Sequence, residues 1–127
     1  MTAAVLAPSR SKSIILWILR VLMAAVFLFA CFMKLSGQPM MVQEFGLFGD
    51  FGQLLRYFTG LLELVGGLAI LVPAFSVFGA IILLVVDVGA FAAQLAVIHQ
   101  DWIHTIVIGA ILATLIYLQR ERLGLGN

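Results

Sequence analysis

Residues 54–72 read LLRYFTGLLELVGGLAILV, and this stretch decides the fold. Most of it is apolar, yet polar and small residues recur every three or four positions, which places them on one face of an α-helix. That face comprises Arg56, Gly60, Glu63, Gly67 and Ile70. A lipid bilayer explains the apolar bulk, and the interior of a helix bundle explains the striped face. The stretch is therefore predicted to span a membrane with its polar face turned toward other helices.

Three further stretches show the same pattern, at about residues 14–35, 75–98 and 102–118. Each is close to the length of about 17–25 residues with which a helix crosses a bilayer. Their striped faces comprise Arg20, Ala24, Phe27, Cys31 and Lys34, then Ala80, Asp87, Ala90 and Gln94, then Thr105, Gly109, Ala113 and Tyr117. The sequence predicts an all-α fold, an integral membrane four-helix bundle that forms a single transmembrane domain over residues 1–127.

Composition supports the membrane class and excludes others. Hydrophobic residues make up 64% of the chain, charged residues make up 10%, and the mean hydropathy is +1.20. A net charge of +1 without a basic run offers no surface for nucleic acid. The single cysteine, Cys31, excludes an internal disulfide and a CxxC redox pair, so dithiol chemistry would need a partner protein.

The connections between the spans predict the topology. Pro73 separates the second span from the third, and His99, Gln100 and Asp101 are expected to form a tight turn before the fourth. The long connection 36–53 holds an amphipathic piece, 40–45, that is predicted to be a short interfacial helix. Basic residues are concentrated at the chain ends, which places both termini in the cytoplasm. These are Arg10, Lys12, Arg120 and Arg122, against Lys34 and Arg56 in the opposite loops.

Charged side chains in lipid are costly and usually face partners or water, so the intramembrane polar residues are the candidate ligand or proton site. They are Arg20, Glu63, Asp87 and Gln94. Two interpretations remain open. In the structural one, a buried Arg20–Glu63 pair locks the first two spans together, with Asp87 nearby. In the functional one, Glu63 or Asp87 is a protonatable group beside a ligand headgroup.

A second polar group is expected to converge at the outer membrane surface. It comprises Lys34, Glu44, Gln94, His99, Asp101 and His104. Two imidazoles on either side of a turn are a weak signal for a metal site, and we predict no bound metal. The pairs Gly66-Gly67, Gly89-Ala90 and Gly109-Ala110 predict close helix packing, either within the bundle or against a second copy or another subunit.

The segment 55–67, LRYFTGLLELVGG, resembles the DoxX family of small bacterial four-helix membrane proteins. Arg20, the segment 27–30 and Lys34 extend the resemblance, which covers about residues 14–120. The family takes its name from a membrane component of thiosulfate:quinone oxidoreductase, and other members are associated with redox-stress systems. The resemblance therefore implies a location in the bacterial inner membrane and a role as the membrane subunit of a quinone-linked redox system. The sequence contains no cofactor motif, and a quinone is the candidate cofactor.

Three functions remain as hypotheses. In the first, a cavity lined by Arg20, Glu63, Asp87 and Gln94 binds a quinone headgroup while a partner subunit handles the other substrate. In the second, the chain is a scaffold or assembly factor that docks a partner and binds no ligand. The third is a proton-coupled transporter like the small multidrug-resistance proteins. Those carry their acidic residue in the first span, where this chain has Arg20, so transport ranks last.

Overall fold

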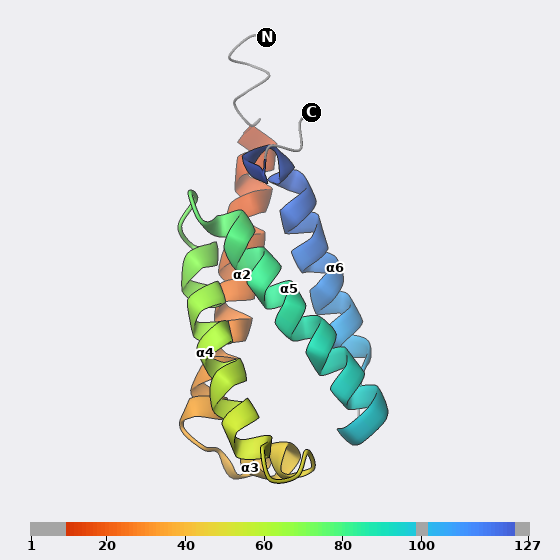
Figure 1. Ribbon diagram of the computed structural model, residues 1–127. Helices are drawn as coiled ribbons and strands as arrows, with labels where there is room; N and C mark the ends of the chain where they lie inside the picture. Colours follow the sequence, from red (N-terminus) through yellow and green to blue (C-terminus); the bar gives the residue numbers. More distant parts are fainter. Residues whose placement is uncertain (1–9, 99–101, 124–127) are drawn as a thin grey trace.

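The computed structural model describes residues 10–98 and 102–123, which are helical with short turns and contain no strand. The elements are α2 (Arg10–Leu35), α3 (Pro39–Gly46), α4 (Gly52–Ile70), α5 (Ser76–Ala93), a π-helical segment η1 (Gln94–Ile98), α6 (Ile103–Leu118) and a 3-10 segment η2 (Arg120–Leu123). The long helices α2, α4, α5 and α6 and the short α3 are labelled in Figure 1. The predicted all-α bundle, with a short helix between the first two long ones, is confirmed.

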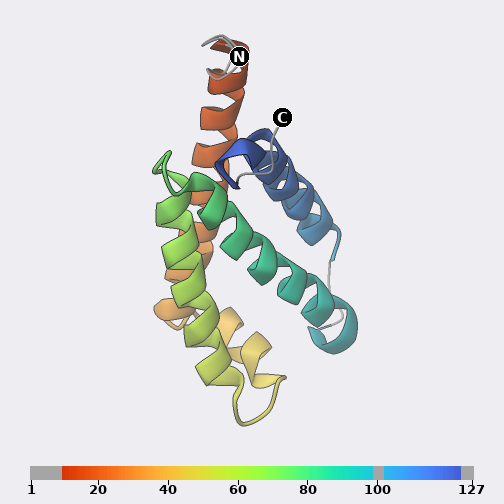
Figure 2. The ribbon, with the colours of Figure 1, turned by 45° about the horizontal axis from the view of Figure 1, so that its top comes forward.

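Neighbouring helices in the chain pack against each other, and α2 also contacts α6. The start of α2 and the segment η2 lie at one end of the bundle, and α3 lies at the other end against α4 (Figure 1). Figure 2 shows that α5 and α6 run side by side and incline away from α4 toward the end that holds α3. The bundle is therefore closed at one end and splayed at the other.

The ends of the helices follow from local sequence. α2 ends before Gly37, whose φ of +72° is a left-handed conformation that glycine adopts readily. Pro39 stands in the first turn of α3, where its missing N–H costs no hydrogen bond. Pro73 lies in the turn between α4 and α5 and prevents the two from forming one continuous helix.

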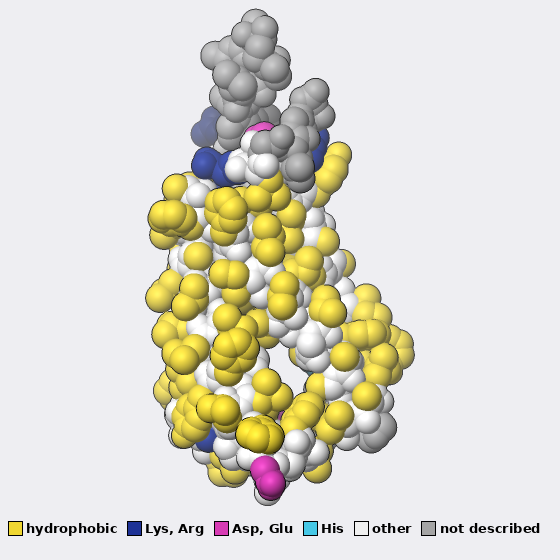
Figure 3. Space-filling model, viewed as in Figure 1, with side chains coloured by type: hydrophobic (Ala, Val, Ile, Leu, Met, Phe, Trp, Pro, Cys, Tyr) yellow, Lys and Arg dark blue, Asp and Glu magenta, His cyan; other side chains and the backbone are white. Residues whose placement is uncertain are grey.

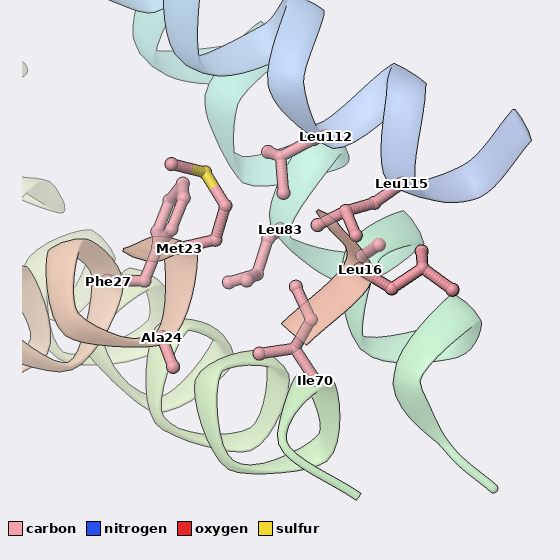
Figure 4. Close-up of a cluster of buried hydrophobic side chains, with 9 residues drawn as sticks. Leu16, Met23, Ala24, Phe27, Ile70, Leu83, Leu112 and Leu115 are labelled. Carbon is pink, nitrogen blue, oxygen red and sulfur yellow. The ribbon is translucent and has the colours of Figure 1, made fainter. Parts of the chain in front are cut away.

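The hydrophobic core fills the closed end, where side chains from all four long helices point toward one another (Figure 4). Its buried members are Leu16, Met23, Ala24, Phe27, Ile70, Ala80, Leu83, Leu112 and Leu115. The backbones of α4 and α5 touch here. A Cβ added at Gly79 would lie 2.7 Å from the backbone nitrogen of Ile70 and 2.8 Å from the carbonyl oxygen of Gly66. Only glycine permits this approach.

The face of the molecule in Figure 3 is predominantly apolar, and all four long helices carry exposed large hydrophobic side chains. Two helical stretches, Arg10–Leu35 and Ser76–Ile98, are long and apolar enough to cross a membrane. Only 33% and 11% of their apolar windows are buried inside the structure, whereas the core helix of a soluble protein is mostly buried. α6 is apolar but shorter, and α4 carries the buried Arg56 and Glu63. Such exposed apolar helices require lipid rather than water around them.

Candidate functional site

A cavity of about 480 Å³ lies in the splayed half of the bundle, on the other side of the core from the chain ends. Figure 3 shows the molecule hollowed between α4 and α5, above α3. The volume falls within the range of roughly 300–1,000 Å³ that is usual for small-molecule sites. Most of the wall is apolar. Its polar members are Lys34, Glu44, Thr59, Glu63, Asp87, Gln94, His104 and Thr105.

Glu63 pairs with Lys34, not with Arg20. The Lys34 ammonium nitrogen lies 3.1 Å from Glu63 Oε1 and donates a hydrogen bond to Oε2 at 3.2 Å. The Glu63 side chain is 4% exposed and that of Lys34 is 12% exposed, so the pair is buried between α2 and α4. The predicted Arg20–Glu63 pair is therefore wrong.

Arg20 instead joins three helical segments at the closed end. Its Nε donates to Ser76 Oγ at 3.0 Å, and its Nη2 donates to Gln119 Oε1 at 2.8 Å. The guanidinium also lies 4.9 Å from the centre of the Trp17 ring. α2 projects past the other helices at this end (Figure 2), so Arg20 is level with the first residue of α5. Arg20 is not part of the cavity wall.

Asp87 of α5 lines the cavity on the side where α5 packs against α6. It is 6% exposed, and no other described residue forms a hydrogen bond or an ion pair with its carboxylate, although His104 acts on it electrostatically. It also lines a second hollow of about 190 Å³ toward α6. A Cβ added at Gly109 would lie 2.8 Å from Asp87 Oδ2, so the glycine makes room for the carboxylate.

Gln94 lies seven residues after Asp87, two helical turns along the same face, at the start of the π-helical segment η1. Its Oε1 is buried and has no hydrogen-bond partner among the described residues. π-Helical turns are rare and frequently occur at functional sites. Here the π-helical segment continues α5 at its C-terminal end, and two of its residues, Gln94 and Ile98, line the cavity.

Arg56 holds the end of α2 in place beside the site. Its Nη1 donates to the backbone oxygen of Lys34, and its Nε donates to Gln53 Oε1 at 2.8 Å. The guanidinium carbon lies 4.3 Å from the centre of the Tyr57 ring, over its face. Arg56 as a whole is 5% exposed. Because it binds the carbonyl group of Lys34, Arg56 positions the lysine that pairs with Glu63.

Of the four candidate site residues, the structure brings Glu63, Asp87 and Gln94 to one cavity and leaves Arg20 outside it. Of the second predicted polar group, Lys34, Glu44, Gln94 and His104 line the same cavity, while His99 and Asp101 lie outside the described residues. Within residues 10–98 and 102–123, no three His, Cys, Asp or Glu side chains gather closely enough to hold a metal ion.

Sequence reasoning missed one feature of the wall and one beside it. Met41 and Phe45 of α3, with Phe48 after it, line the cavity, whereas the amphipathic pattern of residues 40–45 predicted only an interfacial helix. The contact of Arg56 with the end of α2 was also missed, although the sequence placed Arg56 on the same helical face as Glu63.

The family comparison covers the whole site. A model of the DoxX-like family matches residues 18–118, which include the cavity wall from Val26 to Ile108. The chain belongs to the DoxX-like family. This DoxX-like chain is a membrane protein, as its exposed apolar helices also indicate. No curated protein and no solved structure gives a significant match.

Proposed function

We propose that this DoxX-like protein is the membrane subunit of a quinone-linked redox system and binds the quinone headgroup in the cavity between α4 and α5. The observation that carries the proposal is the cavity itself, an apolar chamber with Lys34, Asp87 and Gln94 on its wall. Ligand sites of this kind combine a mostly apolar wall with a few polar groups that orient the ligand.

The wall chemistry suits a quinone. A quinone ring is flat and apolar and offers only carbonyl acceptors, which the Lys34 ammonium and the Gln94 amide can meet as donors. Phe27, Phe45 and Phe58 supply aromatic surface for the ring. The splay between α4 and α5 gives an isoprenoid tail a route from the cavity to the surrounding lipid (Figure 3). When bound, a quinone supplies the electron-accepting chemistry.

The proposal also includes placement and partner. We assign the protein to the bacterial inner membrane with several spans, in line with its family. Both termini are assigned to the cytoplasm, because basic residues are concentrated at the chain ends. The cavity then lies toward the outer face. A further subunit is expected to handle the second substrate, since the chain has one cysteine, Cys31, which is not in the cavity wall.

Binding of a short-chain ubiquinone to the purified protein in detergent micelles tests the proposal. We expect saturable binding that weakens in Phe45→Ala, because the variant removes aromatic surface from the cavity wall. Phe78→Ala is the matched control, since Phe78 is 48% exposed on the outside of α5. The scaffold hypothesis predicts no saturable binding, or binding that both phenylalanine variants leave unchanged.

A further inference from the structure

We infer that the cavity binds the reduced hydroquinone more tightly than the oxidised quinone, because two hydrogen-bond acceptors on its wall have no donor among the described residues. The inference rests on the proposed function and specifies which redox form of the ligand the site selects. The acceptors are the Asp87 carboxylate and Gln94 Oε1.

Neither acceptor has a donor in the part of the chain that the structure describes. No other described residue forms a hydrogen bond with the carboxylate of Asp87, which is only 6% exposed. Gln94 Oε1 is buried and has no hydrogen-bond partner among the described residues. The Glu63 carboxylate differs, because the Lys34 ammonium lies 3.1 and 3.2 Å from its two oxygens. Buried acceptors are normally paired, so Asp87 and Gln94 call for donors from a ligand.

The two redox forms differ in what they offer. A quinone carbonyl only accepts hydrogen bonds, whereas a hydroxyl donates one and also accepts. The hydroquinone can therefore accept from the Lys34 ammonium as the quinone does, and in addition donate to Asp87 and Gln94. Both forms have the same ring and the same tail, so apolar burial cancels in the comparison. The difference in affinity between the two forms therefore comes from the acceptors that only the hydroquinone can satisfy.

The charged groups of the wall act in the same direction. The cavity wall contains the carboxylates of Glu44, Glu63 and Asp87, the ammonium of Lys34, which is engaged by Glu63, and the imidazole of His104, which acts electrostatically on Asp87. Carboxylates accept hydrogen bonds from hydroxyl groups and offer none to a quinone carbonyl. A lipophilic organic cation is the other ligand class that such a wall could take, and it is included as a probe.

The test measures three affinities with one protein. Purified protein is titrated under anaerobic conditions with a short-chain ubiquinone, with the same compound held reduced, and with tetraphenylphosphonium. We expect the hydroquinone to bind about tenfold more tightly than the quinone, which corresponds to a rise of about 30 mV in the two-electron potential of the bound couple. Tetraphenylphosphonium is expected not to displace it.

Variants of Asp87 and Gln94 test whether these two residues cause the tighter binding of the hydroquinone. Asp87→Asn replaces a carboxylate by an amide of the same shape and should bring the ratio of the two affinities close to one. Glu121→Gln makes the same chemical change on η2, outside the cavity, and should leave the ratio unchanged. Gln94→Met removes the second acceptor at similar volume and should lower the ratio of hydroquinone affinity to quinone affinity. This variant provides the test if Asp87→Asn fails to fold.

The outcomes separate this inference from the proposed function. Equal affinities, or a tighter quinone, overturn the inference and leave quinone binding intact. Binding of neither form overturns the proposed function as well. Tight tetraphenylphosphonium binding that depends on Asp87, without a hydroquinone preference, overturns the inference in favour of a cation site.

Discussion

Lys34 in the last turn of α2 and Glu63 in the middle of α4 form a buried ion pair, with the ammonium nitrogen 3.1 and 3.2 Å from the two carboxylate oxygens. The pair lies where the packed core gives way to the cavity. It therefore joins two helices and also contributes charge to the cavity wall. Its stability can be measured separately from ligand binding.

Lys34→Met is expected to destabilise the protein by about 3–5 kcal/mol, because it strands the Glu63 carboxylate in an apolar setting. Lys34→Met combined with Glu63→Gln should cost clearly less than the sum of the two single changes. Chemical unfolding in detergent measures all three variants. Additive losses would show that the pair does not interact.

Arg20 provides the control for this comparison of single and double variants. Arg20→Met removes the hydrogen bonds to Ser76 and Gln119 and should cost about 2–4 kcal/mol, since bonds from charged groups are the stronger kind. Combined with Glu63→Gln, its effect should be additive, because the two residues have separate partners. A coupling energy between them would contradict the assignment of partners.

Substitution of alanine for two glycines of α5, Gly79 and Gly89, should have opposite effects on stability. Gly79→Ala should destabilise the bundle by about 1–3 kcal/mol, because the new Cβ would lie 2.7 Å from a backbone nitrogen of α4. Gly89→Ala should leave stability unchanged or raise it by about 0.5–1 kcal/mol, since nothing lies within 4 Å and alanine favours helix. Thermal unfolding of both variants decides it. Equal losses would mean that α4 and α5 do not touch at Gly79.

Gly109→Ala tests whether the position of Asp87 matters for the ligand. The added Cβ would lie 2.8 Å from Asp87 Oδ2 and should displace the carboxylate. We expect the hydroquinone preference to fall as it does in Asp87→Asn, while the melting temperature changes little. The affinity ratio and the melting temperature are measured on the same preparation. An unchanged ratio in a folded variant would remove Asp87 from the proposed contact.

The membrane orientation is a further prediction. Reporter fusions at either terminus should be active only in the cytoplasm, because Arg10, Lys12, Arg120 and Arg122 lie at the chain ends. A terminus that is labelled from outside intact cells would reverse the orientation and turn the cavity toward the cytoplasm.

The helical fold and most of the polar residues of the cavity wall could be predicted from sequence, because both follow largely from the period of the α-helix. Glu63, Asp87 and Gln94 were on striped faces, and stripes must face one another in a bundle. The partner of Glu63 could not be predicted in this way. Periodicity fixes which face a side chain occupies but not how far one helix slides along another, and α2 extends past the bundle so that Lys34, not Arg20, reaches the level of Glu63.

Contacts that involve the backbone could not be predicted from the helical pattern of the sequence either. The bond from Arg56 to the carbonyl group of Lys34 depends on where α2 ends, and that end is set by Gly37. The approach of Gly79 to α4 depends on the angle between two helices rather than on spacing in either one. Such features need the three-dimensional packing.

Photolabelling with an azido-substituted short-chain quinone tests quinone binding in the cavity most directly, with the attachment sites mapped by mass spectrometry. The structure predicts adducts on cavity residues of α3, α4 and α5, such as Phe45, Phe58 and Ala90, and their loss when excess unlabelled quinone is added. Adducts confined to outward-facing positions such as Val65 and Ile106, or adducts that excess quinone does not displace, would contradict it.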